Sequence, residues 1–251
     1  MINQHGKSDY LPGQHLTNAD LHVWCASLEQ PAEVVEKLRA TLSSEESARA
    51  ERFRFAQHRR FFITSQGILR NLLSRYLEIE PGQIGLEYTQ TGKPHLSSQD
   101  WSAGVSFNLS HSGNWVIYAF TRNRQVGVDI EIIHSIEDMD QIARRNFSRE
   151  EYEDFRSTGE VDRMKAFFNC WTRKEAFIKA TGDGLLFPLQ EFTVSLMPGK
   201  PAKLLSVSSN DKEAARWSMF DIQVADGYAA ALVVEGSGFT ILQREWFLSS
   251  R

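Results

Sequence analysis

The chain has 251 residues, of which 41% are hydrophobic and 24% charged, so it can bury one substantial core or two smaller ones. Its longest apolar stretch, Tyr228 to Val234, is far shorter than the ~20 residues that span a bilayer, and its first residues include no apolar signal segment. We therefore expect a cytoplasmic protein with no membrane partner. The net charge of -4 excludes a globally basic protein that coats nucleic acid, and two cysteines are too few for a disulfide scaffold.

The first third of the chain predicts one strand followed by helices. Residues 20–28 alternate as a strand does, and Pro31 begins a helix that ends near Ala40. The run 42–46 combines serines with glutamates and indicates a second helix start. Residues 48–77 are rich in helix formers and aromatic side chains, and we expect two helices that are separated near residues 56–58.

Arginines are concentrated in this helical region. Seven of them lie between Arg49 and Arg75, against one acid, Glu51. Guanidinium groups bind phosphate with paired hydrogen bonds, so the region is a candidate anion site. The alternative is an ordinary solvated helix face.

The middle of the chain predicts short strands and a polar loop. Tyr88 leads into a turn at Gly92-Lys93-Pro94, and strands are expected over residues 104–109 and 115–121. Residues 110–114 (SHSGN) between these strands are small and polar, and we expect a loop that faces a ligand.

The second half repeats the order of strand, helices and strands. Expected elements are a strand at 126–133, helices at 137–146, 148–156 and 161–181, and strands at 192–196, 217–224 and 228–234. Residues 182–186 stop the last helix, either as an ordinary cap or as a docking loop. The repeated order predicts an α+β protein, although no sequence identity between the halves is apparent. The tail from Thr240 is expected to pack on the body through Ile241, Leu242, Trp246 and Phe247.

Two segments combine the residue types that phosphate chemistry needs. In a strand over 126–133, Asp129 and Glu131 point to one side, and Val128, Ile130 and Ile132 point to the other side, into a core.

In a helix over 161–181, Trp171, Glu175 and Lys179 form one stripe. If this helix packs against the strand, Glu175 joins Asp129 and Glu131 in a cage of hard oxygen ligands, which Mg2+ prefers. The alternatives are a solvated strand face and a surface helix with an ordinary ion pair four residues apart.

Four motifs, taken together, match a known family. They are Gly92-Lys93-Pro94, Phe107-Asn108-Leu109-Ser110-His111-Ser112-Gly113, Gly127-Val128-Asp129-Ile130-Glu131, and Trp171-x-x-Lys174-Glu175-Ala176 followed by Lys179 and Gly182. With these motifs, residues 42–234 resemble the larger, Sfp-type 4'-phosphopantetheinyl transferases. The resemblance implies two similar α/β halves in one chain, related by a pseudo-twofold axis, with the active site in the cleft between them. It assigns coenzyme A phosphate binding to residues 1–125, and metal binding and catalysis to residues 126–251.

The activity that the resemblance implies is a group transfer. The 4'-phosphopantetheine group of coenzyme A moves to a serine of an apo acyl or peptidyl carrier protein, leaving holo carrier protein and adenosine 3',5'-bisphosphate. Such a holo-acyl-carrier-protein synthase serves fatty acid, polyketide or nonribosomal peptide biosynthesis, acts as a monomer, and uses Mg2+, for which Mn2+ can substitute. Coenzyme A is the co-substrate, and no nucleic acid takes part.

The resemblance also implies the site residues, with Arg49 and Arg60 taken from an ungapped match over residues 45–70. Asp129, Glu131 and Glu175 are the expected metal ligands. Glu175, or a metal-bound water that it orients, is the expected base, and Lys179 assists the leaving oxygen or holds the pyrophosphate. The residues expected to bind the coenzyme are Arg49, Arg60, Lys93, Pro94, Ser110, His111, Lys174 and Lys179. Which of the basic residues among them contact the 3'-phosphate is left open.

Two other functions fit part of the pattern. A metal-dependent nuclease or phosphodiesterase also needs clustered acids and a lysine, but it gives the Gly92-Lys93-Pro94 turn no role. An RNA-binding helix explains the arginines but not the acids. Around Arg144, Arg145, Phe147, Lys165 and Leu185, a surface for an acidic carrier protein is one interpretation and a solvated helix face is the other.

Overall fold

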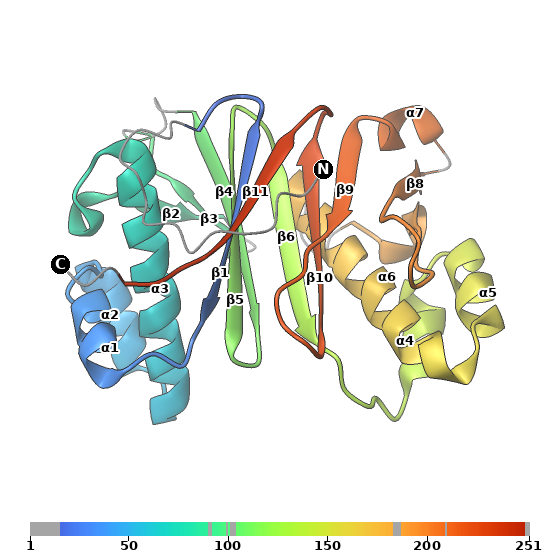
Figure 1. Cartoon of the computed structure of the whole chain (residues 1–251), viewed down its shortest axis with the longest axis horizontal. Coiled ribbons are helices and arrows are strands. Elements are labelled where there is room, and N and C mark those ends of the chain that lie inside the picture. Colours follow the sequence, from blue (N-terminus) through green and yellow to red (C-terminus); the bar gives the residue numbers. More distant parts are fainter. Residues whose placement is uncertain are drawn as a thin grey trace. The chain divides into compact units, whose positions relative to one another are not determined.

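The computed structural model describes residues 16–89, 92–98, 100, 104–182, 187–208 and 210–248. These form two compact units, each with helices and sheets (Figure 1). The first unit holds the residues up to Ser106, Asn114–Asn123 and the residues from Thr240; the second holds Phe107–Gly113 and Arg124–Phe239. Among the helices of the described part, none is long and apolar enough to cross a membrane.

The first unit holds β11, β1 and β5 of a four-stranded sheet whose order is β11-β1-β5-β4, and a two-stranded sheet of β2 and β3. Its elements are β1 (Asp20–Ser27), α1 (Ala32–Arg39), α2 (Ser44–Glu51), α3 (Ala56–Leu77), a 3-10 turn (Pro81–Gln83), β2 (Leu86–Tyr88), β3 (Pro94–Leu96), β5 (Trp115–Arg122) and β11 (Thr240–Glu245). Strand β4 (Val105–Ser112) begins in this unit, and its residues from Phe107 belong to the second unit.

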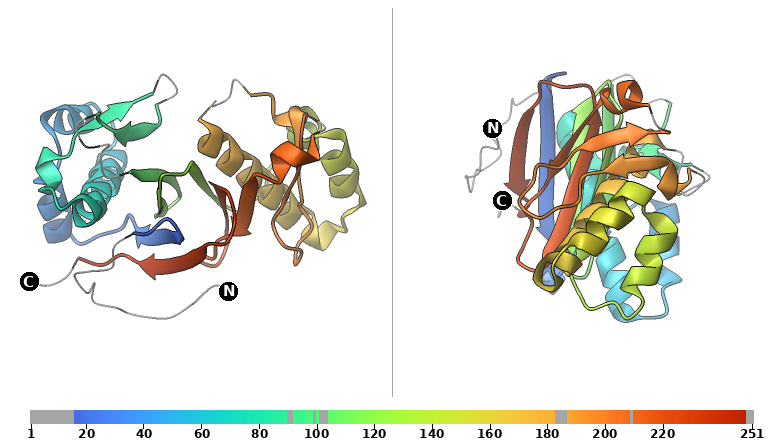
Figure 2. Two further views of the ribbon diagram at one scale, coloured as in Figure 1. Left: turned by 90° about the horizontal axis from the view of Figure 1, so that it is seen from above. Right: turned by 90° about the vertical axis from the view of Figure 1, so that its right-hand side faces the viewer.

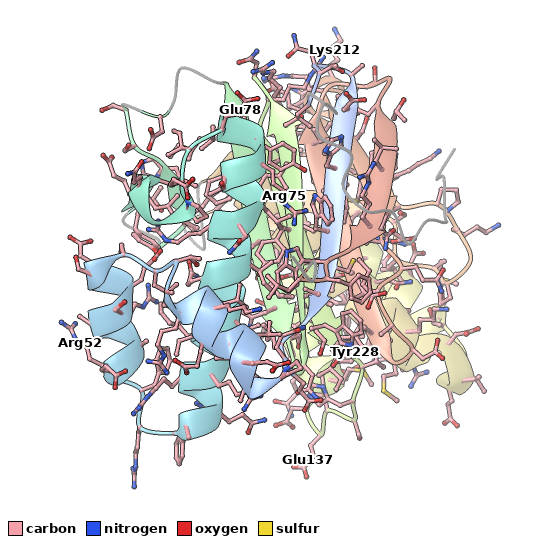
Figure 3. The ribbon with its side chains drawn as sticks, turned by 60° about the vertical axis from the view of Figure 1, so that its left-hand side comes forward. Arg52, Arg75, Glu78, Glu137, Lys212 and Tyr228 are labelled. Carbon is pink, nitrogen blue, oxygen red and sulfur yellow. The ribbon has the colours of Figure 1, made fainter. Side chains whose placement is uncertain are left out.

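Helix α3 covers one face of the sheet in the first unit. The Tyr118 hydroxyl of β5 donates to the Ser65 carbonyl of α3, and the Trp24 indole N–H of β1 donates to the Tyr76 hydroxyl at 2.8 Å. Figure 3 shows Arg75 on the side of α3 that faces β1, and its guanidinium lies 5.7 Å from the Trp24 ring centre. These contacts explain why β1 is buried along most of its length.

The second unit has a three-stranded antiparallel sheet in the order β6-β10-β9 and a two-stranded sheet of β7 and β8. Its elements are β6 (Val126–Ile132), α4 (Met139–Asn146), α5 (Arg149–Ser157), α6 (Glu160–Thr181), a 3-10 turn (Leu189–Glu191), β7 (Phe192–Val194), β8 (Leu204–Val207), α7 (Asp211–Ala214), β9 (Trp217–Asp221) and β10 (Tyr228–Glu235). Helix α6 packs along β6 and β10, as Figures 1 and 2 show.

A glycine sets the distance between β6 and α6. A Cβ atom at Gly127 would lie 2.1 Å from the Ala176 carbonyl oxygen and 2.3 Å from the Ala180 amide nitrogen, both in the backbone of α6. Since no side chain fits in that space, the glycine allows the helix and the strand to touch backbone to backbone. The chemical groups on Asp129 and on the last two turns of α6 are thereby brought together.

Most helix and strand predictions are confirmed to within a few residues, and α2 and α5 each begin after a serine cap. Ser43 and Ser148 each accept, at Oγ, a hydrogen bond from the backbone amide of the third residue of their helix. That residue is a glutamate in both cases, and its carboxylate accepts a hydrogen bond from the backbone amide of the cap serine. The break in the arginine-rich region falls slightly earlier than expected, after Glu51 and before Ala56.

Three expectations about local structure are wrong. Ser110, His111 and Ser112 belong to β4 and not to a loop, so the connection to β5 is only Gly113 and Asn114. Ile132 is 39% exposed although it was expected in the core, and Asp129, expected on a polar side, is only 3% exposed.

The expectation for the tail is confirmed for most of its apolar residues. β11 pairs in parallel with β1, and Ile241 and Trp246 are buried, whereas Phe247 is 57% exposed, against expectation. Leu185 and most of the segment expected at 182–186 lie outside the described residues.

Candidate active site

Asp129 is the centre of a buried polar cluster on β6. Lys179 of α6 places its Nζ atom 2.6 Å from Asp129 Oδ1 and donates a second hydrogen bond, 2.9 Å long, to Ser110 Oγ. Ser110 Oγ in turn donates to Asp129 Oδ1 at 2.8 Å. The predicted metal ligand Asp129, the predicted lysine and the predicted coenzyme-binding serine therefore form one closed triangle.

The other carboxylate of β6 is held by a different serine. Ser112 Oγ donates to Glu131 Oε2 at 2.8 Å and accepts a hydrogen bond from the Ile132 amide at 3.1 Å. Glu131 is half-buried. Asp129 and Glu131 thus each receive a hydrogen bond from an alternate residue of β4.

Glu175 lies one turn before Lys179 on α6, and both are half-buried, as is Trp171 one turn earlier. Trp171 stacks on the ring of Phe167, with 6.0 Å between ring centres. The expected stripe of three residues on α6 is therefore present, and its first member packs against the core.

Electrostatics link the three carboxylates. Burial raises the pKa of Asp129, and the Lys179 ammonium opposes that rise. Burial also raises the pKa of Glu131 and of Glu175, and in each case the charge of Asp129 raises it further. Glu131 adds to the rise at Glu175, while Lys179 lowers the pKa of both glutamates. A cation that joins these three acids stabilises their ionised forms.

The donor set suits a hard divalent cation. Asp129 Oδ2 is buried and has no hydrogen-bond partner among the residues that the structure describes, so one carboxylate oxygen is available as a ligand. Carboxylate oxygens are what Mg2+ prefers. In the described part of the chain, however, no three acidic, histidine or cysteine side chains are already gathered closely enough to hold a metal ion. The chemistry of the residues fits Mg2+, whereas their positions are those of a site in which Lys179 neutralises Asp129.

Lys174 lies on the opposite side of α6, away from this cluster. Its side chain is 1% exposed and its Nζ atom is 2.7 Å from Glu151 Oε2 of α5. It also donates to the carbonyl oxygens of Leu189 and Phe192. These contacts fix α6 inside its own unit, and they add no support to the prediction that Lys174 binds the coenzyme.

His111 sits between Ser110 and Ser112 on β4, with its side chain on the other side of the strand. Partial burial lowers the pKa of His111, and the positive charge of Lys179 lowers it further. The imidazole is therefore neutral near pH 7 and can offer a phosphate a hydrogen bond rather than a full charge.

The other predicted coenzyme-binding residues lie in the first unit. Arg49 of α2 places its guanidinium 5.9 Å from the ring centre of Tyr88 in β2, and Tyr88 is the pairing partner of Pro94 in β3. The structure thus brings Arg49 beside the turn that contains Lys93. Arg60, near the start of α3, is exposed and donates to the Gln30 carbonyl.

The sequence interpretation missed two residues that shape the cluster and one that fixes the opposite side of α6. Asn108, buried in β4, accepts a hydrogen bond from the Val128 amide at 2.8 Å. Gly127 permits the close contact with α6, and Glu151 neutralises Lys174. Asn108 and Gly127 lie inside the matched motifs, and that position could have identified them as site residues. Their contacts could not be predicted, because their partners are distant in sequence.

Comparison with known proteins agrees with the motifs. A family model described as the 4'-phosphopantetheinyl transferase superfamily matches residues 125–233, and one described as 4'-phosphopantetheinyl transferase, N-terminal, matches residues 26–123. The 4'-phosphopantetheinyl transferase HetI of Nostoc sp. is 41% identical over 228 residues, which cover 91% of this chain and 93% of HetI.

Two relatives from Bacillus match over a shorter length. The 4'-phosphopantetheinyl transferase psf-1 of Bacillus pumilus is 37% identical over 68% of this chain and 70% of its own. The 4'-phosphopantetheinyl transferase Sfp of Bacillus subtilis is 32% identical over 64% of this chain and 69% of its own. The protein therefore belongs to the 4'-phosphopantetheinyl transferase family.

Proposed function

We propose that this family member transfers the 4'-phosphopantetheine group of coenzyme A to a serine of an apo acyl or peptidyl carrier protein and releases adenosine 3',5'-bisphosphate. The observation that carries the proposal is the buried Asp129 paired with Lys179, with the half-buried Glu131 and Glu175 electrostatically linked to it. Two glutamates whose pKa values are raised by burial and by the charge of Asp129, next to one lysine, suit a pyrophosphate ester and its counter-cation.

The three carboxylates would hold Mg2+, for which Mn2+ can substitute. When bound, the cation would neutralise charge on the pyrophosphate as the bond between the pantetheine-side phosphorus and the bridging oxygen breaks, the oxygen leaving with adenosine 3',5'-bisphosphate. Asp129 Oδ2 is the oxygen best placed to serve as a ligand because it is buried without a hydrogen-bond partner among the described residues.

Glu175 and Lys179 would handle the proton and the leaving group. The carrier serine gives its hydroxyl proton to the Glu175 carboxylate, directly or through a water, as its oxygen bonds to phosphorus. A base with a raised pKa accepts a proton more readily, and burial and neighbouring acids raise the pKa of Glu175. Lys179, already a double donor within the cluster, would donate to the leaving phosphate oxygen.

The 3'-phosphate of the coenzyme needs its own partners. We assign it to Arg49, Arg60, Lys93 and His111, with Ser110 adding a neutral hydrogen bond and Pro94 shaping the turn against the adenine. The position of Arg49 beside Tyr88 and the Lys93 turn supports a shared role for Arg49 and Lys93. Five further parts of the proposal rest only on the resemblance to the family. They are the binding of coenzyme A between two halves, the cytoplasmic location, the monomeric state, the absence of a nucleic-acid partner and the choice of carrier.

Product release tests the proposal. The protein is mixed with Mg2+, an apo carrier protein and either coenzyme A or its 3'-dephospho form, and nucleotide release is measured by chromatography. We expect release of adenosine 3',5'-bisphosphate only with carrier present, and weaker use of the dephospho form. Asp129→Asn should abolish release, whereas Asp226→Asn, at an exposed aspartate of the same unit, should not. No release with acyl and peptidyl carriers alike would contradict the proposal.

The same comparison tests the 3'-phosphate assignment. Arg49→Ala should raise the KM for coenzyme A and leave the KM for the dephospho form nearly unchanged, because the lost partner matters only when the 3'-phosphate is present. An equal rise for both forms would place Arg49 elsewhere.

A further inference from the structure

Side chains of β4 bind one edge of β6. β6 is the edge strand of its sheet and pairs with β10 on the other side. Along the edge that faces away from β10, the Val128 amide donates to Asn108 Oδ1 and the Ile132 amide donates to Ser112 Oγ. Because amides of alternate residues point to the same edge of a strand, both contacts lie along one line.

The groups that bind this edge come from one side of β4. Asn108, Ser110 and Ser112 alternate in sequence and therefore point the same way. Their contacts follow the order of β6: the Val128 amide, the Asp129 carboxylate, and then the Glu131 carboxylate with the Ile132 amide. Each of the three thus has a fixed partner.

The two hydrogen bonds of Ser112 determine where its proton points. An amide N–H can only donate, so Ser112 Oγ must accept from Ile132 with a lone pair. The hydroxyl has one proton, and Glu131 Oε2 is 2.8 Å away to receive it. The backbone of β6 therefore orients the Ser112 hydroxyl, and the hydroxyl fixes one oxygen of Glu131.

We propose that Ser112 is a positioning residue that presents the Glu131 carboxylate to the divalent cation, and the proposal rests on the metal site of the proposed function. Glu131 is half-buried and its side chain has several rotatable bonds, while the Lys179 ammonium is paired with Asp129. Residues that hydrogen-bond to a ligating carboxylate restrict its orientation, and their loss typically weakens metal binding by about 10- to 100-fold.

The test uses Ser112→Ala, which removes the hydroxyl, and Ser112→Thr, which keeps it. Mg2+ binding to the full chain is measured by calorimetry, and the Mg2+ concentration for half-maximal transfer is measured with saturating coenzyme A. Ser157→Ala, at an exposed serine of α5, is the matched control. Unfolding midpoints without metal show whether any variant is merely less stable.

We expect Ser112→Ala to weaken Mg2+ binding and to raise the half-maximal Mg2+ concentration by about tenfold, with the unfolding midpoint and the KM for coenzyme A nearly unchanged. Ser112→Thr should restore binding to within about threefold of the wild type. If Ser112→Ala binds Mg2+ as the wild type does, or loses affinity only in proportion to its stability, Ser112 does not position Glu131. If the wild type itself neither binds Mg2+ nor transfers the group, the proposed function fails. The wild type alone shows that outcome, whereas only the Ser112 variants test the positioning role.

Discussion

Replacing Gly127 with alanine perturbs the contact that joins β6 to α6. The added Cβ would meet the Ala176 carbonyl oxygen at 2.1 Å, about 1.3 Å closer than the shortest ordinary van der Waals approach of 3.4 Å. The atoms it meets belong to a helix backbone and cannot rotate away. Strand and helix must therefore separate by about 1 Å, and overpacking of this kind typically destabilises a protein by about 1–3 kcal/mol. We expect a loss at the upper end of that range.

The same displacement should weaken catalysis. Lys179 and Glu175 move with α6, whereas Asp129 moves with β6, so the 2.6 Å contact between Lys179 and Asp129 lengthens. A misplacement of about 1 Å can cost roughly 100-fold in rate. Urea unfolding gives the stability, and carrier modification at saturating coenzyme A and Mg2+ gives the rate.

Gly159→Ala is the matched control. Gly159 precedes α6, has a negative φ of -61°, and would place its Cβ in open space. We expect it to cost less than about 1 kcal/mol and to leave the rate near that of the wild type. A Gly127→Ala protein with wild-type stability and rate would refute the view that backbone contact between β6 and α6 sets the geometry of the cluster.

Two further predictions concern buried charge. Glu151→Gln leaves the Lys174 ammonium buried without its ion pair, and it should lower the free energy of unfolding in urea by about 3–5 kcal/mol. Glu153→Gln, in an exposed pair on the same helix, should change it by less than about 1 kcal/mol, and equal effects of the two variants would contradict the structural role of the buried pair. Burial lowers the pKa of His22 to about 4, so the imidazole binds a proton more weakly in the folded protein than in the unfolded chain. The free energy of unfolding should therefore fall by up to about 3 kcal/mol as the pH drops from 6.5 to 4. His22→Asn should remove that part of the pH dependence and His58→Gln, at an exposed histidine, should not; a pH-independent difference between wild type and His22→Asn would show that His22 does not resist protonation.

Local signals in the sequence predicted much of the fold. The capping boxes at Ser43 and Ser148 mark helix starts through contacts only three residues apart, and the helical spacing of Trp171, Glu175 and Lys179 predicted their shared stripe. These features depend on neighbours along the chain, which a sequence shows directly.

Features that depend on distant partners were missed. Ser110 to Ser112 looks like a loop because it is short and polar, yet it continues β4, and its hydroxyls are satisfied by β6 about 20 residues later. β11 pairs with β1 from the far end of the chain. The burial of Lys174 depends on its ion pair with Glu151, which lies on a separate helix. Tertiary contacts of this kind override local propensity and polarity.

The most direct test is the mass of the carrier protein. An apo acyl or peptidyl carrier is incubated with coenzyme A, Mg2+ and the protein, and its intact mass is measured. We predict a gain of one phosphopantetheine group on a single serine with the wild type, and no gain with Asp129→Asn or after Mg2+ is removed with a chelator. An unmodified carrier of both types with the wild type, or full modification by Asp129→Asn, would contradict the central claim.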